Sequence, residues 1–269
     1  MIPQGLQETL AGATVLDLSH PYRTGMPQSP NHPPFRMVLE RRHGDMVRAD
    51  GGSAANEIIV LGGHVGTHVD ALAHVSHQGK LHGGVDAAGQ QSHRGFATLG
   101  IDTFQPFVGR AVHLDVAAVH GVPTLPPGYE VTVADLETAR KAAGVELRPG
   151  EVIVVGTGWA REWSRYDVFT GQTGGAPGPG LEAARWLADY QPVVLGAETI
   201  AFEQIAPDKG HALLPVHRLL LVDRGINIME TMNLAPLADA GVSEFLLVVN
   251  PLPIAGATGA PVRPLAITW

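Results

Sequence analysis

The sequence contains no cysteine among its 269 residues, so disulfide bridges, thiolate zinc sites and cysteine nucleophiles are excluded. Aromatic residues make up only 6% of the chain and charged residues only 16%. Basic residues are scarce as well, since 18 Lys and Arg face 26 Asp and Glu and give a formal net charge of −8. This acidic balance argues against a general nucleic-acid or anionic-membrane binder. Any metal site must use histidine, aspartate and glutamate.

Long hydrophobic runs are also missing. No apolar run approaches the roughly 18–20 residues that span a bilayer, and the N-terminal stretch lacks the basic and apolar regions of a signal peptide. We therefore expect a cytoplasmic protein. The hydrophobic fraction of 45% is nevertheless too high for a disordered chain. No linker or repeat divides the sequence, so we expect a single domain over residues 1–269, with the Gly-rich segment 171–180 as a surface loop.

Short β-branched runs predict more strands than helices. The predicted strands are 13–18, 56–61, 109–116, 152–156, 192–196, 226–229 and 245–249, with 252–254 and 262–267 as two further candidates. The predicted helices are 133–143, 181–190 and 214–222. Thr132 is a plausible N-cap for the first helix and Gly144 its stop. Because strands and helices do not alternate one for one, a mixed α/β fold is favoured over a doubly wound parallel sheet.

Three of the 13 histidines lie in one glycine-rich segment, GGHVGTHVDALAH at 62–74. Within it, His64, His68, Asp70 and His74 fall inside eleven residues. The glycines and β-branched residues favour an extended chain, on which His68 and Asp70 point to the same side and His64 shares their parity. Gly66 leaves room on that face for an ion or substrate. Two imidazoles and a carboxylate suit Zn²⁺ or Mn²⁺.

A lone histidine is more often a hydrogen-bonded core residue than a ligand. The aspartate two residues after His68 and the further histidine six residues after it shift the interpretation towards a metal site. His77 and His82 follow in a polar stretch, and we expect them at most to line the mouth of the site.

Three ligands from one segment rarely complete a coordination shell, so a distant contributor is expected. Glu230 interrupts an apolar strand pattern and would be costly to bury without a partner. His217 opens an amphipathic helical stretch, and His211 is a weaker candidate of the same kind. Taken alone, a helix-capping histidine and a paired glutamate explain these residues about as well as metal ligation does.

The stretch HVGTHVDALAH resembles the HxGTHxDxPxH signature of the cyclase-like metal-dependent hydrolase family, which includes bacterial kynurenine formamidase and isatin hydrolase. The segments VLDLSHPYRTGMPQSPNHPPF, GEVIVVGTGW, HRLLLVDRGINIMETMNL and EFLLVVNPLPIAGATGAPVRPLAI resemble other parts of the family, in chain order. The resemblance implies an α/β fold with a mixed sheet, the swivelling β/β/α domain of this family. It also implies a homo-oligomer, either a dimer or a tetramer.

The resemblance further implies that one or two divalent ions, zinc or manganese, are held by His64, His68, Asp70, His217 and Glu230. It implies that His74 is the catalytic acid/base. The expected reaction is hydrolysis of an amide-type C–N bond, in an N-formyl amide or a lactam, by a metal-activated water. The alternatives are a lactone hydrolase, a lyase or cyclase on the same scaffold, or a non-catalytic metal- or ligand-binding protein. The expected partner is a small-molecule substrate, with no nucleic acid or membrane involved.

Two departures from the family pattern stand out. Leu72-Ala73 stands where the motif often has proline before its last histidine, and this change removes no ligand. The aromatic Trp-Pro-Gly element of the two named members is replaced by Ser29-Pro30-Asn31. A flat stacking platform for the substrate is therefore absent or supplied by Phe35, Trp159 or Trp163.

Overall fold

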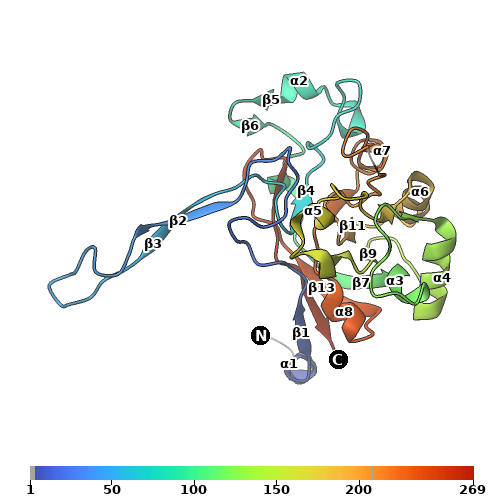
Figure 1. Cartoon of the computed structure of the whole chain (residues 1–269), viewed down its shortest axis with the longest axis horizontal. Helices are drawn as coiled ribbons and strands as arrows, with labels where there is room; N and C mark the ends of the chain where they lie inside the picture. The colour runs from blue at the N-terminus through green and yellow to red at the C-terminus, as the bar shows by residue number, and fades with distance from the viewer. Residues whose placement is uncertain (1–3, 208) are drawn as a thin grey trace.

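A nine-stranded mixed sheet forms the centre of the computed structural model, which describes residues 4–207 and 209–269 (Figure 1). Its strand order is β1-β15-β13-β7-β9-β11-β12-β4-β14. The central strands run parallel and are β7 (Phe107–Asp115), β9 (Val152–Gly156), β11 (Val194–Ala197) and β12 (Asn227–Glu230). Antiparallel strands extend this centre on both sides: β13 (Glu244–Val249), β15 (Leu265–Thr268) and β1 (Thr14–Asp17), and β4 (His68–Asp70) and β14 (Gly259–Pro261). The predicted mixed α/β fold is confirmed.

One face of the sheet is covered by helices α3 (Val116–Val119), α4 (Val133–Ala143) and α6 (Leu181–Asp189). Helix α4 has the predicted bounds, because Thr132 accepts a hydrogen bond from the Asp135 amide and Gly144 ends the helix in the left-handed conformation. Side chains from the strands and the buried sides of these helices form the larger hydrophobic core.

The opposite face carries a second core, which is closed by α8 (Ala235–Asp239) and neighbouring loops. Residues along β9 alternate between the two cores: Val152 and Val154 pack in the second, and Ile153 and Val155 in the first. The strand is buried on both sides, so it has a continuous apolar sequence without polar alternation.

Four sequence-based predictions differ from the structure. Residues 252–254 form no strand, and the predicted strand 262–267 is shifted to β15. The predicted helix 214–222 is a short α7 (Pro215–His217) that continues as a π-helix (Arg218–Arg224). The glycine-rich loop is exposed only in its first half.

The second half of that loop, residues 175–180, is buried and contains β10 (Gly178–Pro179), which pairs with β8 (Glu130–Val131). A Cβ atom on Gly178 would lie 2.5 Å from the backbone of Glu203. The glycines permit close backbone packing here and do not mark a surface position.

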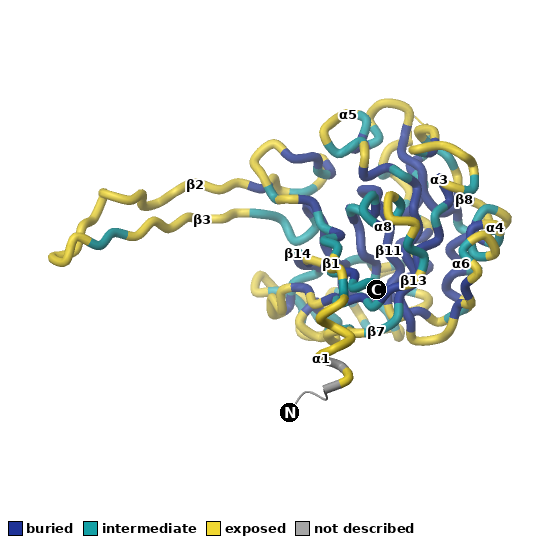
Figure 2. The backbone as a smooth tube through the Cα atoms, turned by 90° about the horizontal axis from the view of Figure 1, so that it is seen from below, coloured by how far each residue is buried: buried dark blue, intermediate teal, exposed yellow. Residues whose placement is uncertain are grey.

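The most unusual feature is a hairpin that projects from the body (Figures 1 and 2). It consists of β2 (Arg36–Arg41), an irregular tip, and β3 (Asn56–Val60), and we call residues 36–60 the arm. The predicted strand at 56–61 therefore exists, but every residue of β3 is exposed.

The remaining short elements are α1 (Gln4–Ala11), α2 (Ala87–Gln90), β5 (Gln91–Ser92), β6 (Gly95–Phe96), α5 (Tyr166–Phe169) and 3-10 turns at His82–Gly84, Ile101–Thr103 and Trp159–Glu162. In the described part of the chain, no helix is both long and apolar enough to cross a membrane.

Candidate functional site

Two antiparallel neighbours in the sheet, β4 and β12, bring three of the predicted ligands together. His68 lies directly opposite Glu230 in the register of these strands, and Asp70 is on the same side of β4 as His68, as predicted. His68 Nε2 is 3.3 Å from Asp70 Oδ1 and 3.5 Å from Glu230 Oε2. All three side chains are buried. The site lies at the carboxyl end of β12, the usual position of ligands in open α/β sheets.

His64 reaches the same carboxylate from outside the strand. The expectation that it shares a strand with His68 is wrong, because β4 begins only at His68. Gly66 turns the chain with φ +63°, and a Cβ there would lie 2.7 Å from the ring of Tyr22. This turn returns His64 Nδ1 to within 2.6 Å of Asp70 Oδ1. A glycine is therefore needed at position 66 both for its conformation and for space.

Two further imidazoles lie beside His64. The ring of His74 stacks on it, with the ring centroids 3.8 Å apart. The ring of His32 stacks on His64 at 5.2 Å and lies 6.3 Å from His74. No role for His32 was predicted from the sequence. The only available signal was its position directly after Ser29-Pro30-Asn31, where the family's aromatic element is replaced.

The late histidine of the cluster is His217 at the C-terminal end of α7. Its Nε2 lies 3.1 Å from Glu230 Oε1 and 3.7 Å from Asp70 Oδ2. Glu203 holds it in place, because this carboxylate accepts hydrogen bonds from the His217 amide at 2.8 Å and from His217 Nδ1 at 2.7 Å. The alternative candidate, His211, lines a neighbouring hollow of about 410 Å³.

Glu203 is the second residue of the site that was not predicted from the sequence. It orients His217 with Nε2 towards the carboxylates, as outer partners of metal-binding histidines do. Nothing in the spacing of Glu203 and His217 predicts this contact, because a loop and the start of α7 separate them.

The electrostatics of the cluster call for added positive charge. Burial acts to raise the pKa of Asp70, but the neighbouring His74 and His64 hold it well below its usual range. Burial and the negative charge of Asp70 raise the pKa of Glu230. Burial acts to lower the pKa of His217, but its carboxylate neighbours raise it well above the ordinary value. Without a cation, these buried carboxylates favour protonated groups around them. A bound divalent cation would supply that positive charge instead.

The ligating atoms also fit an ion geometrically. Two groups of three place their nitrogen and oxygen atoms within 4.8 Å of one another: His64, Asp70 and His74, and His68, Asp70 and Glu230. His68 Nε2 and Asp70 Oδ2 are buried without a hydrogen bond, which is costly unless something else binds them. Nitrogen and oxygen donors of this kind suit zinc or manganese. Asp70 belongs to both groups, so the arrangement can accommodate one ion or two.

Substitution of Glu203 by glutamine is expected to weaken zinc affinity by about 10- to 100-fold, because it removes the carboxylate that orients His217. Competition with a chromophoric chelator measures this. The matched control is Glu198→Gln, since Glu198 is equally buried but accepts hydrogen bonds from the amides of Thr157 and Trp159. Equal affinities of the two variants would contradict a positioning role for Glu203.

The turn at 156–159, which follows β9, is packed inside the chain. Trp159 is 1% exposed and donates a hydrogen bond from Nε1 to the Phe169 carbonyl. Of the other two candidate platform residues, Phe35 is buried and Trp163 is partly buried against other side chains. Phe35 contacts a small apolar cluster, and Trp163 stacks on His20 with a centroid separation of 4.1 Å.

His20 makes stability depend on pH. Burial lowers its pKa from 6.5 to about 4, so the folded protein favours neutral His20. The resulting stability is present above pH 6.5 and is lost as the pH falls towards 4, at a total cost of about 3 kcal/mol. We expect His20→Gln to reduce the loss of unfolding free energy between pH 7 and pH 4.5, measured by denaturant titration. An unchanged pH dependence in this variant would contradict the assignment.

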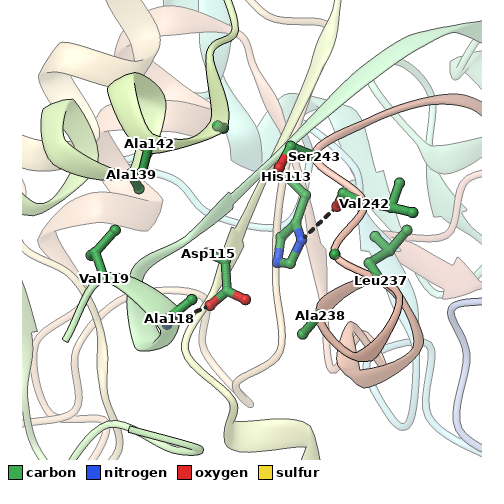
Figure 3. A pocket seen from close by; sticks show the side chains of 12 residues that line it. His113, Asp115, Ala118, Val119, Ala139, Ala142, Leu237, Ala238, Val242 and Ser243 are labelled. Carbon is green, nitrogen blue, oxygen red and sulfur yellow. Dashed lines mark hydrogen bonds between the residues drawn. The ribbon is translucent and has the colours of Figure 1, made fainter. Parts of the chain in front are cut away.

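A separate hollow of about 200 Å³ surrounds His113 (Figure 3). His113 Nδ1 donates a hydrogen bond to the Val242 carbonyl at 3.2 Å, and burial lowers its pKa. Within residues 4–207 and 209–269, the groups of three able to hold an ion are those that share Asp70. The candidate site is therefore the histidine cluster and not this hollow.

Comparison with known proteins agrees with this fold. The chain matches the model of the Cyclase family over residues 16–204. It is 28% identical to an isatin hydrolase of Roseibium aggregatum over 223 residues, which cover 81% of this chain and 77% of the relative. The crystal structure of a novel cyclase has a TM-score of 0.85 at 30% identity, covering 99% of this chain and 92% of that chain. Isatin hydrolase A from Ralstonia solanacearum has a TM-score of 0.75 at 24% identity, covering 100% and 98%.

These structures confirm the predicted cyclase-like fold, and the family match includes β4 with its flanking histidines. The chain therefore belongs to the cyclase family.

Proposed function

We propose that this protein is a metal-dependent hydrolase that cleaves an amide-type C–N bond of a small molecule, either an N-formyl amide or a lactam. The observation that carries the proposal is the convergence of half-buried His64 with buried His68, Asp70, His217 and Glu230. The similarity to isatin hydrolase supports it, because isatin is a cyclic amide.

A divalent ion bound here, zinc or manganese, would act as a Lewis acid that polarises a carbonyl and lowers the pKa of water towards about 7. The protein supplies the proton transfers. Burial lowers the pKa of His74 to about 3, so its imidazole is neutral at pH 7 with one ring nitrogen unprotonated, and the negative charge of Asp70 acts to raise this pKa and favours uptake of a proton at that nitrogen. His74 then delivers this proton to the leaving nitrogen. Stacking on His64 fixes the His74 ring beside the carboxylates for both transfers.

The surroundings of the site favour a compact, polar substrate over a flat aromatic one. His32 lies over His64, in the segment where other members carry their aromatic element. The polar side chains of Asn31, Gln172 and His211 lie in the lining of the neighbouring hollow, beside small and apolar residues. These groups offer hydrogen bonds to a polar substrate, and the described residues that line the hollow include no phenylalanine, tyrosine or tryptophan.

The family name itself favours a second candidate, a lyase or cyclase that uses the same residues to stabilise an enolate. Incorporation of ¹⁸O from labelled water into the product separates hydrolysis from this reaction. Turnover assays on non-aromatic lactams, N-formyl amides, lactones and isatin separate both enzymes from a purely ligand-binding protein and identify the substrate class.

Exhaustive chelation is expected to abolish turnover, and Zn²⁺ or Mn²⁺ is expected to restore it, because the buried carboxylates need a cation. Activity after dialysis against chelator, followed by titration with each ion, measures this. Dialysis without chelator is the control. Full activity in protein shown to be metal-free would overturn the proposed function.

A further inference from the structure

Two of the histidines that face the buried carboxylates use Nδ1 for an outer contact. His68 Nδ1 donates a hydrogen bond to the Gly66 carbonyl at 2.7 Å, and His217 Nδ1 donates one to Glu203 at 2.7 Å. A carbonyl or a carboxylate only accepts, so the proton of each ring is on Nδ1 when the ring is neutral, as a metal ligand must be. Both rings therefore present the lone pair of Nε2 to the carboxylates of the cluster.

His64 is oriented the other way round. Its Nδ1 lies 2.6 Å from Asp70 Oδ1, and its Nε2 lies 2.9 Å from the hydroxyl oxygen of Thr258. The outer contact of His64 is therefore at Nε2, and the partner is a hydroxyl group, which can both donate and accept. Thr258 is 194 residues further along the chain, so local spacing does not predict this contact.

We propose that Thr258 is a positioning residue of the metal site, whose hydroxyl holds the ring proton of His64 on Nε2 and so makes Nδ1 the ligating atom. This assignment rests on the proposed function, because it assumes an ion at the site. An ion binds an imidazole through the lone pair of one nitrogen, so Nδ1 must be unprotonated and the proton must lie on Nε2. Thr258 Oγ1 then accepts a hydrogen bond from that nitrogen, as outer partners of metal-binding histidines do.

A hydroxyl at this position also suits the protein before an ion binds. Asp70 Oδ1 then accepts a hydrogen bond from His64 Nδ1, and the unprotonated Nε2 needs a donor. The Thr258 hydroxyl supplies it, because its hydrogen rotates to suit the partner. A carbonyl or a carboxylate in the same place could only accept. Thr258 therefore keeps both nitrogens of His64 occupied as an ion binds and leaves.

The backbone around Thr258 is held against the site. The Thr258 carbonyl accepts a hydrogen bond from the Ala71 amide at 2.8 Å, and the next residue, Gly259, pairs with Asp70 across β14 and β4. A Cβ atom on Gly259 would lie 2.5 Å from the His64 ring, so a glycine is needed for this close approach. These contacts involve the main chain, so a substitution of the Thr258 side chain tests the hydroxyl alone.

Zinc affinity of side-chain variants, measured by competition with a chromophoric chelator, tests the proposal. Thr258→Val removes the hydroxyl but keeps the branching of the side chain, and it is expected to weaken zinc binding by about 10- to 100-fold. Thr258→Ser restores a hydroxyl and is expected to bind zinc as the wild type does. Thr124→Val is the matched control, because Thr124 is a half-buried threonine whose hydroxyl donates a hydrogen bond to the Gly158 carbonyl.

The crystal structure of the zinc-loaded wild type provides a readout that does not depend on the variants. We expect His64 Nδ1 at about 2.0–2.1 Å from zinc, with Nε2 still hydrogen-bonded to Thr258, whereas His68 binds through Nε2. Zinc bound through His64 Nε2 would overturn the assignment.

The affinities also separate failure of this assignment from failure of the proposed function. A Thr258→Val protein that binds zinc as tightly as the wild type, or a Thr258→Ser protein as weak as Thr258→Val, would overturn the role of Thr258 and leave the metal site intact. A wild-type protein that binds no zinc would overturn the metal site itself, and the role of Thr258 with it.

Discussion

Replacing Asp70 with alanine is expected to remove bound metal and activity together, with turnover falling by at least about a thousandfold. Asp70 is the residue common to both groups of ligating atoms. Its carboxylate contacts His64 at 2.6 Å and His68 at 3.3 Å, so no neighbouring oxygen can replace it without moving the chain. His64→Ala is expected to have the same effect in the same direction. Metal content by mass spectrometry and turnover on one protein sample measure both losses.

The control for this substitution is Asp223→Ala. Asp223 is an exposed aspartate that pairs with Arg218 at 3.7 Å in the π-helix after His217, and it does not contact the cluster. It should retain full metal content and activity. A folded Asp70→Ala protein that binds a full equivalent of metal would show that the ion is held elsewhere.

The sequence predicts the part of the site that depends on local chain geometry. The two-residue period of a strand places His68 and Asp70 on one side of β4, and this holds in the structure. The cost of burying Glu230 correctly pointed to a nearby partner, because β12 lies beside β4 in the sheet. His64 shows where this reasoning fails, since a turn and not a strand brings it to the carboxylate.

The remaining features depend on contacts between distant segments. Glu203 meets His217 only because the loop after β11 packs against the start of α7, and His32 meets His64 only because the loop before the arm folds back. Only the second strand of the arm was predicted, at 56–61, and β2 was not. An apolar, β-branched run indicates an extended chain, but it does not show whether the chain's own core covers that strand.

The second large effect is expected for His74→Ala, which should retain bound metal and lose turnover by about 10²- to 10⁴-fold. In the proposed mechanism His74 moves a proton and is not needed to hold the ion, because four other ligands remain around Asp70. Its neutral imidazole lies 3.8 Å from the ring of His64 and 6.2 Å from that of His217, beside the carboxylates. Metal content and single-turnover rates at matched metal loading measure the two properties separately.

His77→Ala is the control, because His77 lies three residues further along the chain and outside both groups of ligating atoms. It is expected to keep both metal and turnover. The result that would contradict this role is that His74 is itself a metal ligand. A ring nitrogen of His74 forms, with His64 and Asp70, one of the two groups that could hold an ion. If His74→Ala is metal-free and as inactive as Asp70→Ala, His74 is a ligand and the proton transfers must come from another group. His32 would then be the next residue to test, since its ring lies 6.3 Å from that of His74.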